Sequence, residues 1–450
     1  MASVDANTSG PALSQEGAVA RFLRATEIDT RMLGMVAALV VIWVGFDIFS
    51  GIIRPGDGLL GGTFLTPRNL WILLVQTSSI AVMTTGMVLI IVMRQIDLSV
   101  GSILGFTAVC IGTAQVYWLP AWGFPVGHPT IWIVTLIMGL AIGAAIGAFH
   151  GTLIAFAGIP SFIVTLGGLI VWRGAAWWVI RGETVAPMDK NFKLIGGGIS
   201  GTTPGAIGYT ASWILGLVIC ALIAAAIVNG RRQRQRFNFP LRPVWAETFL
   251  AALGCALTLG ATWIVNSYFW PKGVVDRYAA ETGIAVPPEG LNIAFGYSVP
   301  VLIALGIGLA MTFMATRTRF GRYIYATGGN PEAAELAGID TKKITVMIFS
   351  LMGALAAVSA SISSARLDSA TNALGQFDEL YVIAAAVIGG TSLAGGLGTI
   401  YGALLGALVM QSLQSGMTLL NFESAVKDMV VGSVLVFAVW IDQIYRRKVK

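Results

Sequence analysis

The chain has 450 residues, of which 56% are hydrophobic and only 11% are charged, and its formal net charge is +6. An average soluble domain carries about 25% charged residues, so this composition excludes a water-soluble globular protein and indicates that lipid covers much of the surface. The 55 glycines agree with this interpretation, because small residues let helices pack closely inside a membrane.

Cysteine and histidine are both rare. The three cysteines lie in apolar stretches, and the two histidines, His128 and His150, are far apart in the sequence. An odd number of apolar cysteines argues against a disulfide framework, and two isolated histidines give no basis for a metal cluster. The sequence therefore predicts no metal site, no cofactor and no catalytic residue in this chain.

The N-terminal 30 residues are mostly polar and lack the apolar core and the small-residue cleavage site of a signal peptide. We therefore expect a cytoplasmic tail over 1–30, a transmembrane domain over 31–442 and a basic cytoplasmic tail over 443–450. The first apolar run then stays in the protein as a membrane anchor.

Apolar stretches follow one another along the transmembrane domain, and a spanning helix needs about 20 mainly apolar residues. The tenth and twelfth stretches are short, and several glycines between 389 and 398 interrupt the chain, which fits either two half-crossings or a re-entrant hairpin. The sequence predicts an all-α polytopic membrane protein with about twelve transmembrane segments. They run near 33–53, 71–93, 98–119, 131–156, 161–180, 212–229, 247–268, 297–316, 343–362, 381–393, 398–418 and 428–442.

Lysine and arginine are distributed unequally between the two sides of these segments. With the N-terminus inside, the inner flanks hold 18 of the 28 basic residues, and the outer loops hold 8. Arg173 and Lys427 lie inside or beside predicted spans. Because cytoplasmic loops are enriched in Lys and Arg, this asymmetry predicts that both termini are cytoplasmic, which an even number of crossings allows.

Two ionisable residues stand out within the first half of the domain, where a charge costs about 2.5–3.5 kcal/mol at a helix centre. Asp97 lies at the cytoplasmic end of its span next to Ser99, so it either caps the helix or lines an inner gate. Arg173 lies in the middle of its span and faces either a structural ion-pair partner or the path of a solute.

A short capped helix is predicted in the cytoplasmic loop over 317–342. Asn330 is a good N-cap, Pro331 suits the first helical position, Glu332 is favoured by the helix dipole, and Gly338 ends the helix. The alternatives are a plain connector and a helix whose apolar face docks on another protein. The residues expected to form this docking element are Gly328, Gly329, Asn330, Pro331, Glu332, Ala333, Ala334, Leu336 and Gly338.

A polar stretch over 371–379 lies on the predicted outer side. Its residues Asn372 and Gln376 are candidates for the entrance of a solute path, for contact with a docked protein, or for a solvated loop.

Three stretches of this sequence resemble one known family. Glu332-Ala-Ala-x-x-x-Gly338 resembles the coupling motif of ABC importer permeases, and its surroundings are similar to permeases that import ribose, xylose, arabinose and galactose. Residues 96–102 and 385–398 resemble that family's signature and its glycine-rich segment. The resemblance covers about 70–181 and 297–442, with the three motifs in the family's order.

Between about 205 and 295 the chain departs from the shorter ribose-type pattern. It carries an additional helical hairpin over 212–268, closed on the inside by the arginine-rich run 231–236. Two added crossings leave the orientation of all later segments unchanged, which favours an insertion. Because xylose-type permeases are the longer members of the family, they are the expected relatives. The arginine run is either a stop signal or a contact with lipid phosphates or an ATPase.

The resemblance implies a permease subunit of a binding-protein-dependent ABC importer in the bacterial inner membrane, with D-xylose or a related pentose as the solute. It implies a homodimer, a separate cytoplasmic ATPase and a periplasmic sugar-binding protein. The chain has no Gly-x-x-x-x-Gly-Lys-Ser/Thr motif, so we expect it not to be an enzyme itself, and nothing in it suggests a nucleic-acid partner.

Two other functions fit the sequence less well. An ion-driven secondary transporter needs carboxylates at mid-membrane depth, which are few, and a membrane enzyme acting on lipid-linked substrates needs a polar cluster that the sequence does not show.

Overall fold

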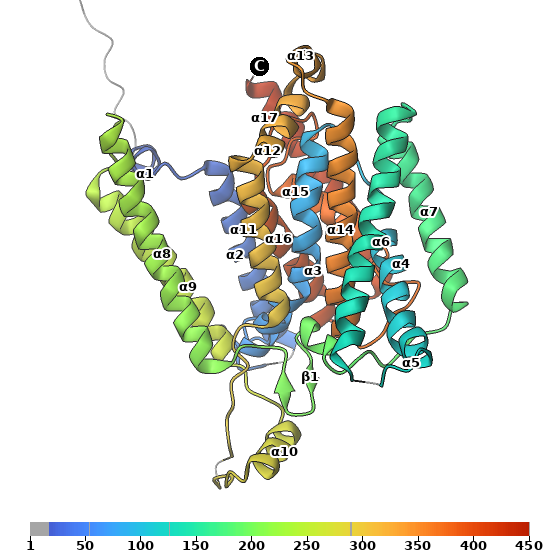
Figure 1. Cartoon of the computed structure of the whole chain (residues 1–450). Helices are drawn as coiled ribbons and strands as arrows, with labels where there is room; N and C mark the ends of the chain where they lie inside the picture. Colours follow the sequence, from blue (N-terminus) through green and yellow to red (C-terminus); the bar gives the residue numbers. More distant parts are fainter. Residues whose placement is uncertain (1–17, 54, 126, 289, 450) are drawn as a thin grey trace, which may run out of the picture.

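The computed structural model describes residues 18–53, 55–125, 127–288 and 290–449, and for 18–20 and 441–449 it describes only the backbone. The described chain is a bundle of roughly parallel helices with one detached helical hairpin (Figure 1). This confirms the predicted all-α polytopic architecture. The helices long and apolar enough to span a membrane in this part of the chain are α2 (Thr30–Ile53), α3 (Pro67–Val92), the continuous stretch Val100–Ala121, α6 (Pro129–Phe156), α7 (Ser161–Ile180), α8 (Gly208–Arg236), α9 (Val244–Asn266), α11 (Val299–Arg317) and α14 (Thr341–Leu367).

The remaining elements complete the bundle and its loops. The stretch Val100–Ala121 consists of α4 (Val100–Thr113), a π-helical turn η1 (Ala114–Trp118) and α5 (Leu119–Ala121). The C-terminal part holds α15 (Asp378–Ile388), α16 (Ile400–Leu419) and α17 (Ser424–Val449). The short elements are α1 (Ala18–Thr26), η2 (Phe192–Gly196), the antiparallel strands β1 (Ile199–Ser200) and β2 (Thr203–Pro204), α10 (Lys272–Thr282), α12 (Arg319–Gly329) and α13 (Pro331–Leu336).

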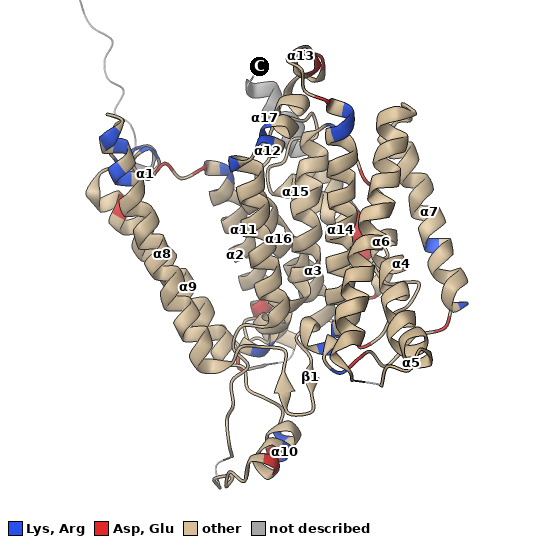
Figure 2. Ribbon diagram, viewed as in Figure 1, with Lys and Arg blue, Asp and Glu red and all other residues tan. Residues whose placement is uncertain are grey.

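Basic side chains gather at one end of the molecule, around α1, α12 and the start of α14 (Figure 2). The C-terminus lies at the same end (Figure 1). We call this the inner end and the opposite one, where α10 and the β-hairpin lie, the outer end. The arrangement agrees with the predicted orientation, although twelve crossings and cytoplasmic termini stay predictions.

The tenth predicted span, near 381–393, is corrected by the structure. Its helix α15 has 11 residues, about 16 Å at 1.5 Å per residue and only half of a hydrocarbon core of about 30 Å. The preceding segment 369–377 is not a regular helix and runs inward beside α4, because Ala370 bridges to Val185 and Leu374 lies against Gly105. This crossing therefore consists of an irregular outer half, called the re-entrant segment below, and a helical inner half.

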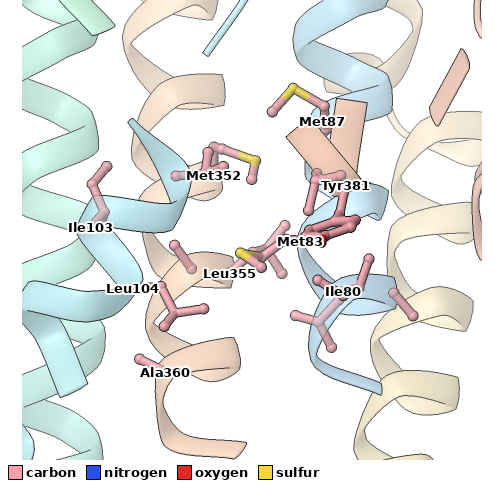
Figure 3. Packing of buried hydrophobic residues seen from close by; sticks show 14 of the residues in the cluster. Ile80, Met83, Met87, Ile103, Leu104, Met352, Leu355, Ala360 and Tyr381 are labelled. Atoms are coloured by element: carbon pink, nitrogen blue, oxygen red, sulfur yellow. The ribbon is translucent and has the colours of Figure 1, made fainter. Parts of the chain in front are cut away.

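The apolar core is centred on α3, which is buried by α14, α16, α11 and α15. Figure 3 shows Met83 and Met87 of α3 facing Met352 and Leu355 of α14. Methionine and leucine fill this space with flexible and branched side chains. The core thus fixes α3 as the axis around which the other helices are placed.

Helices α6 and α14 approach each other closely, and glycines of α6 make that approach possible. A Cβ atom on Gly143 would lie 2.9 Å from the Cβ of Ala357, and one on Gly151 would lie 2.7 Å from the Cα of Val346. Small residues spaced by four positions allow two helix backbones to touch inside a membrane.

The predicted hairpin over 212–268 is present as α8 and α9, and it stands away from the bundle at the inner end (Figure 1). Only about a tenth of each helix's apolar window is buried. The hairpin is attached near the outer end, where Val265 packs with Trp71, Phe295 and Tyr297. Its origin as an insertion stays a prediction, as do the domain limits drawn from the sequence.

Candidate functional site

A polar cavity of about 540 Å³ lies in the outer half of the bundle, within the roughly 300–1,000 Å³ typical of small-molecule sites. It is formed by the first turns of α3, the last turn of α14, the second half of α16 and the re-entrant segment with the start of α15. Its polar lining residues are Asn69, Gln76, Ser79, Ser363, Arg366, Asp378, Gln411, Gln414, Ser415, Thr418 and Asn421.

Two carboxamides of this cavity are positioned by hydrogen bonds to neighbouring side chains. The Nε2 of Gln411 donates to the Oε1 of Gln76 at 3.1 Å, and the Nε2 of Gln414 donates to the Oη of Tyr381 at 3.3 Å. Each carboxamide has two donor hydrogens and an acceptor oxygen, so each keeps hydrogen-bonding capacity for a solute. Such a lining can replace the water around a neutral, hydroxyl-rich molecule.

The re-entrant segment forms part of the cavity wall. Arg173 of α7 binds its backbone. The Nη1 of Arg173 donates to the carbonyl oxygens of Asn372 at 2.8 Å and Leu374 at 2.7 Å, and its Nη2 donates to that of Gly375 at 3.2 Å. Irregular backbone at membrane depth needs such partners, because lipid offers no hydrogen bonds. The planar guanidinium, which has five donors, can bind several carbonyls at once.

Glycines of α4 let the re-entrant segment approach closely. A Cβ atom on Gly105 would lie 2.6 Å from the carbonyl oxygen of Leu374, and Gly375 itself has a φ of +72°. Because side chains rarely adopt that backbone conformation and Gly375 also faces α4, substitution there is strained for two reasons.

The structure shows where the predicted path residues Arg173, Asn372 and Gln376 lie. Arg173 forms no salt bridge with the described residues and instead donates to backbone carbonyls, so the structure does not show the ion pair that was one of the two alternatives. Asn372 reaches Arg173 through its carbonyl, and Gln376 is exposed. Neither lines the cavity, whereas the neighbouring Leu374, Gly375 and Asp378 do. Roles of Arg173, Asn372 and Gln376 in a solute path stay predictions.

A chain of hydrogen bonds near the start of α4 connects it with α6 and α7. The Oδ1 of Asp97 accepts from the Oγ of Ser99 at 2.6 Å, Ser99 Oγ lies 3.3 Å from His150 Nδ1, and Trp172 Nε1 donates to His150 Nε2 at 3.1 Å. With Nε2 accepting, the proton of a neutral imidazole sits on Nδ1. Every donor in the chain then has an acceptor, so α7 is attached to the bundle here.

The predicted N-cap role of Asp97 is corrected by this geometry. Ser99 occupies the N-cap position of α4, and Asp97 accepts from the backbone N–H of Ser99 at 2.9 Å in a turn before the helix. A role of Asp97 and Ser99 in an inner gate stays a prediction.

The predicted cytoplasmic helix is present as α13, with the expected caps. The Oδ1 of Asn330 accepts from the N–H of Ala333 at 3.1 Å, Pro331 is the first helical residue, and Gly338 has a φ of +82° after the last turn. Leu336 is 90% exposed and Ala333 is exposed as well.

Ala334 departs from the expected docking role. It is only 4% exposed, because it points toward the bundle rather than away from it. Ala333 and Leu336 are therefore the apolar residues of α13 that remain accessible to another protein, and Glu332 is exposed beside them. Docking at α13 stays a prediction.

Arg94, at the inner end of α3, binds the backbone just before α13. Its Nε donates to the carbonyl oxygen of Gly328 at 2.7 Å, and its Nη2 donates to that of Gly329 at 2.6 Å. The N–H of Gly396, in the loop between α15 and α16, donates to the carbonyl oxygen of Val92 at 2.9 Å. The segment before α13 is thus tied to elements that line the cavity at their other ends.

The cavity residues and the contacts of Arg94 were not predicted from the sequence. Gln76 and Gln411 lie about 335 positions apart, so no local pattern joins them. A signal existed nevertheless, because both are glutamines within apolar spanning stretches, and buried polar groups in a membrane mark functional positions. Arg94 is one of the 18 basic residues on the predicted inner flanks, and nothing in the sequence indicates its backbone contacts.

Comparison with known proteins extends this description. A family model described as "Branched-chain amino acid transport system / permease component" matches residues 69–439. The xylose transport system permease protein XylH of Haemophilus influenzae is 33% identical over 421 residues, which cover 94% of this chain and 98% of that protein. Its counterpart in Escherichia coli K12 is 34% identical over 425 residues, 94% of each chain. The ribose import permease protein RbsC of Escherichia coli K12 is 32% identical over 383 residues, 85% of this chain and 88% of that protein.

No solved structure matches the chain significantly. The predicted resemblance to sugar importer permeases, and to the xylose type among them, is confirmed by these relatives. They are inner-membrane, multi-pass transport subunits rather than enzymes. The chain therefore belongs to the branched-chain amino acid transport system / permease component family and is a multi-pass inner-membrane permease of the ABC sugar-importer type.

Proposed function

We propose that this chain forms the path by which D-xylose or a related pentose enters the cell, powered by a separate ATPase chain and supplied by a periplasmic sugar-binding protein. Two of the relatives described above are named xylose permeases. The observation that carries the proposal is the outer cavity lined with carboxamides and hydroxyls, whose helices also reach α13 at the inner end.

In the proposed mechanism, the ATPase binds α13 at Leu336 and Ala333 and moves it when ATP is bound. Arg94 passes this movement to α3, because it holds the carbonyls of Gly328 and Gly329. The loop between α15 and α16 moves with α3 through the Gly396–Val92 hydrogen bond. Since α3, α15 and α16 line the cavity, movement at the inner end changes its shape and releases the sugar inward.

A second copy of the chain in the transporter is part of the proposal, as the resemblance implies. The comparisons give it no support, so the homodimer rests on the resemblance alone. The mass of the purified complex, with the ATPase and binding protein present, measures the number of copies directly.

One observation favours an ion-driven transporter instead. Asp378 lines the cavity and Glu379 lies buried beside it, and carboxylates at that depth are what ion coupling requires. The two functions differ in what drives uptake.

The test uses proteoliposomes that contain this chain, its ATPase and its binding protein. We expect labelled D-xylose to accumulate only with ATP in the ATPase compartment, and an uncoupler to leave the rate unchanged. Uptake by the chain alone, driven by an ion gradient without ATP, would overturn the importer proposal.

The cavity lining should affect the rate of transport. Gln414→Leu is expected to lower D-xylose uptake about 10-fold, because one or two lost hydrogen bonds to a solute cost about 1.4 kcal/mol. The apolar replacement suits the membrane, so the amount of inserted protein should stay normal. Initial uptake rates, corrected for the protein present, measure the effect.

Gln235→Leu is the matched control, because Gln235 is exposed near the inner end of α8 and far from the cavity. Equal uptake rates in the two variants would remove Gln414 from the solute path.

A further inference from the structure

The inner end of the α8–α9 hairpin carries an unusual concentration of arginines. Five lie between residues 231 and 242, and Arg21 and Arg24 of α1 lie at the same end of the molecule (Figure 2). Phe22 of α1 packs on the rings of Trp245 and Phe249, with centroids 5.9 and 5.4 Å apart. This contact holds α1 against the hairpin, so both sets of charges belong to one surface.

Carboxylates neutralise only part of this surface. Glu27 pairs with Arg234 at 2.7 Å and with Arg242 at 2.6 Å, and Glu247 pairs with Arg231 at 2.8 Å. Hydrogen bonds from Arg234 and Arg242 lower the pKa of Glu27 to about 2, so this carboxylate is charged at neutral pH.

Arg232 and Arg236 remain available for an external anion. Both are exposed, and neither has an ion pair or hydrogen bond with the described residues. They are four positions apart in α8, so they lie one above the other on the same helix face.

The length of α8 places these two arginines at the level of lipid headgroups. The helix has 29 residues, or about 44 Å, which exceeds a hydrocarbon core of about 30 Å. If the apolar stretch from Gly208 crosses the core in about 20 residues, Arg232 and Arg236 lie about 6–12 Å beyond it. The headgroup layer of the inner leaflet is about 5–8 Å thick. Arg232 lies within it, and the side chain of Arg236, which tilts toward the start of α8, can reach back to it.

The surface next to the arginines is apolar and open to lipid. Leu217 and Leu222 of α8 are 59% and 62% exposed, and Leu257 of α9 is 67% exposed. At the basic end, Phe237 and Trp245 are 65% and 51% exposed. Because the hairpin stands away from the bundle at this end (Figure 1), its exposed leucines are open to acyl chains, and Phe237 and Trp245 are open to the headgroup layer. A molecule with both a phosphate and acyl chains fits this surface better than an acidic protein does.

We propose that the inner end of the hairpin is a binding site for an anionic phospholipid, with its phosphate at Arg232 and Arg236 and its acyl chains along α8 and α9. The site stabilises the hairpin in its position apart from the bundle. The proposal does not depend on the transported solute, because lipid binding is measured without transport.

The test uses the full-length chain, purified in mild detergent and titrated with phosphatidylglycerol or phosphatidylcholine while native mass spectrometry counts the bound lipids. We expect phosphatidylglycerol to bind preferentially. The double substitution Arg232→Gln/Arg236→Gln should weaken its binding about 30-fold, since each basic residue near a membrane surface contributes about a factor of five. Lys272→Gln/Arg277→Gln is the control, because both residues are exposed at the outer end.

Three results would overturn the proposal. Equal binding of the two lipids would show that charge is not recognised. Displacement of phosphatidylglycerol by millimolar inorganic phosphate would indicate a site for free anions. Unchanged lipid binding in the arginine variant, with loss of a co-purifying ATPase, would assign the arginines to a protein contact.

Discussion

Leu336→Arg is expected to abolish ATP-driven uptake while the chain still inserts into the membrane. Leu336 is 90% exposed on α13, and a lone leucine so exposed at the inner end is suited to docking on another protein. A charge in the centre of such a contact costs about 2 kcal/mol or more, which weakens binding about 30-fold. Co-purification of the ATPase and uptake in proteoliposomes measure the two effects.

Leu59→Arg is the control for this substitution. Leu59 is 83% exposed in the loop between α2 and α3 at the outer end, so the same change occurs there without touching α13. If the Leu336 variant keeps a stoichiometric ATPase and normal uptake, α13 is not the docking element and the proposed coupling through it fails.

The position of Arg94 explains why docking at α13 can act at a distance. A helix of six residues has too little surface to transmit force alone. Two charge-assisted hydrogen bonds from Arg94 hold the preceding carbonyls of Gly328 and Gly329 against the end of α3. Because α3 is buried along almost its whole apolar length, we expect it to move as one body. In the proposed mechanism, the movement of this small surface element reaches the cavity through these contacts.

Local chemistry was sufficient to predict α13. Asn330, Pro331 and Gly338 each determine a backbone feature within a few residues, and the structure shows these features as expected. The length of each apolar stretch predicted the spanning helices in a similar way, because length and hydropathy are properties of one continuous segment.

The crossing through α15 could not be predicted from apolar length. The apolar stretch continues to about 393, yet the helix ends at Ile388, because Gly389 packs against the backbone of Gly402 and Gly390 has a φ of +85°. Whether the polar residues before Asp378 form an outer loop or enter the membrane depends on Arg173, which lies about 200 positions earlier in the chain and binds their backbone. Backbone carbonyls have no sequence signature, so nothing marked them as the partners of Arg173.

Arg173→Met is expected to lower the free energy of unfolding by about 3 kcal/mol or more and to reduce uptake to background. Three carbonyls of the re-entrant segment lose their donor, and a hydrogen bond from a charged group is worth about 1.5–3 kcal/mol. Thermal unfolding of the detergent-solubilised complex, together with uptake, measures both effects. Arg181→Met is the control, since Arg181 is exposed at the outer end of the same helix.

Arg173→Lys separates stability from transport. Lysine keeps the charge but lacks the planar fork, so it can bind one or two of the three carbonyls and should restore part of the stability. If Arg173 shapes the cavity wall, uptake by this variant stays low after its stability has largely recovered, because Leu374 and Gly375 line the cavity. Uptake that recovers in proportion to stability would show that Arg173 supports the fold alone. Normal stability and uptake in Arg173→Met would contradict the carbonyl contacts themselves.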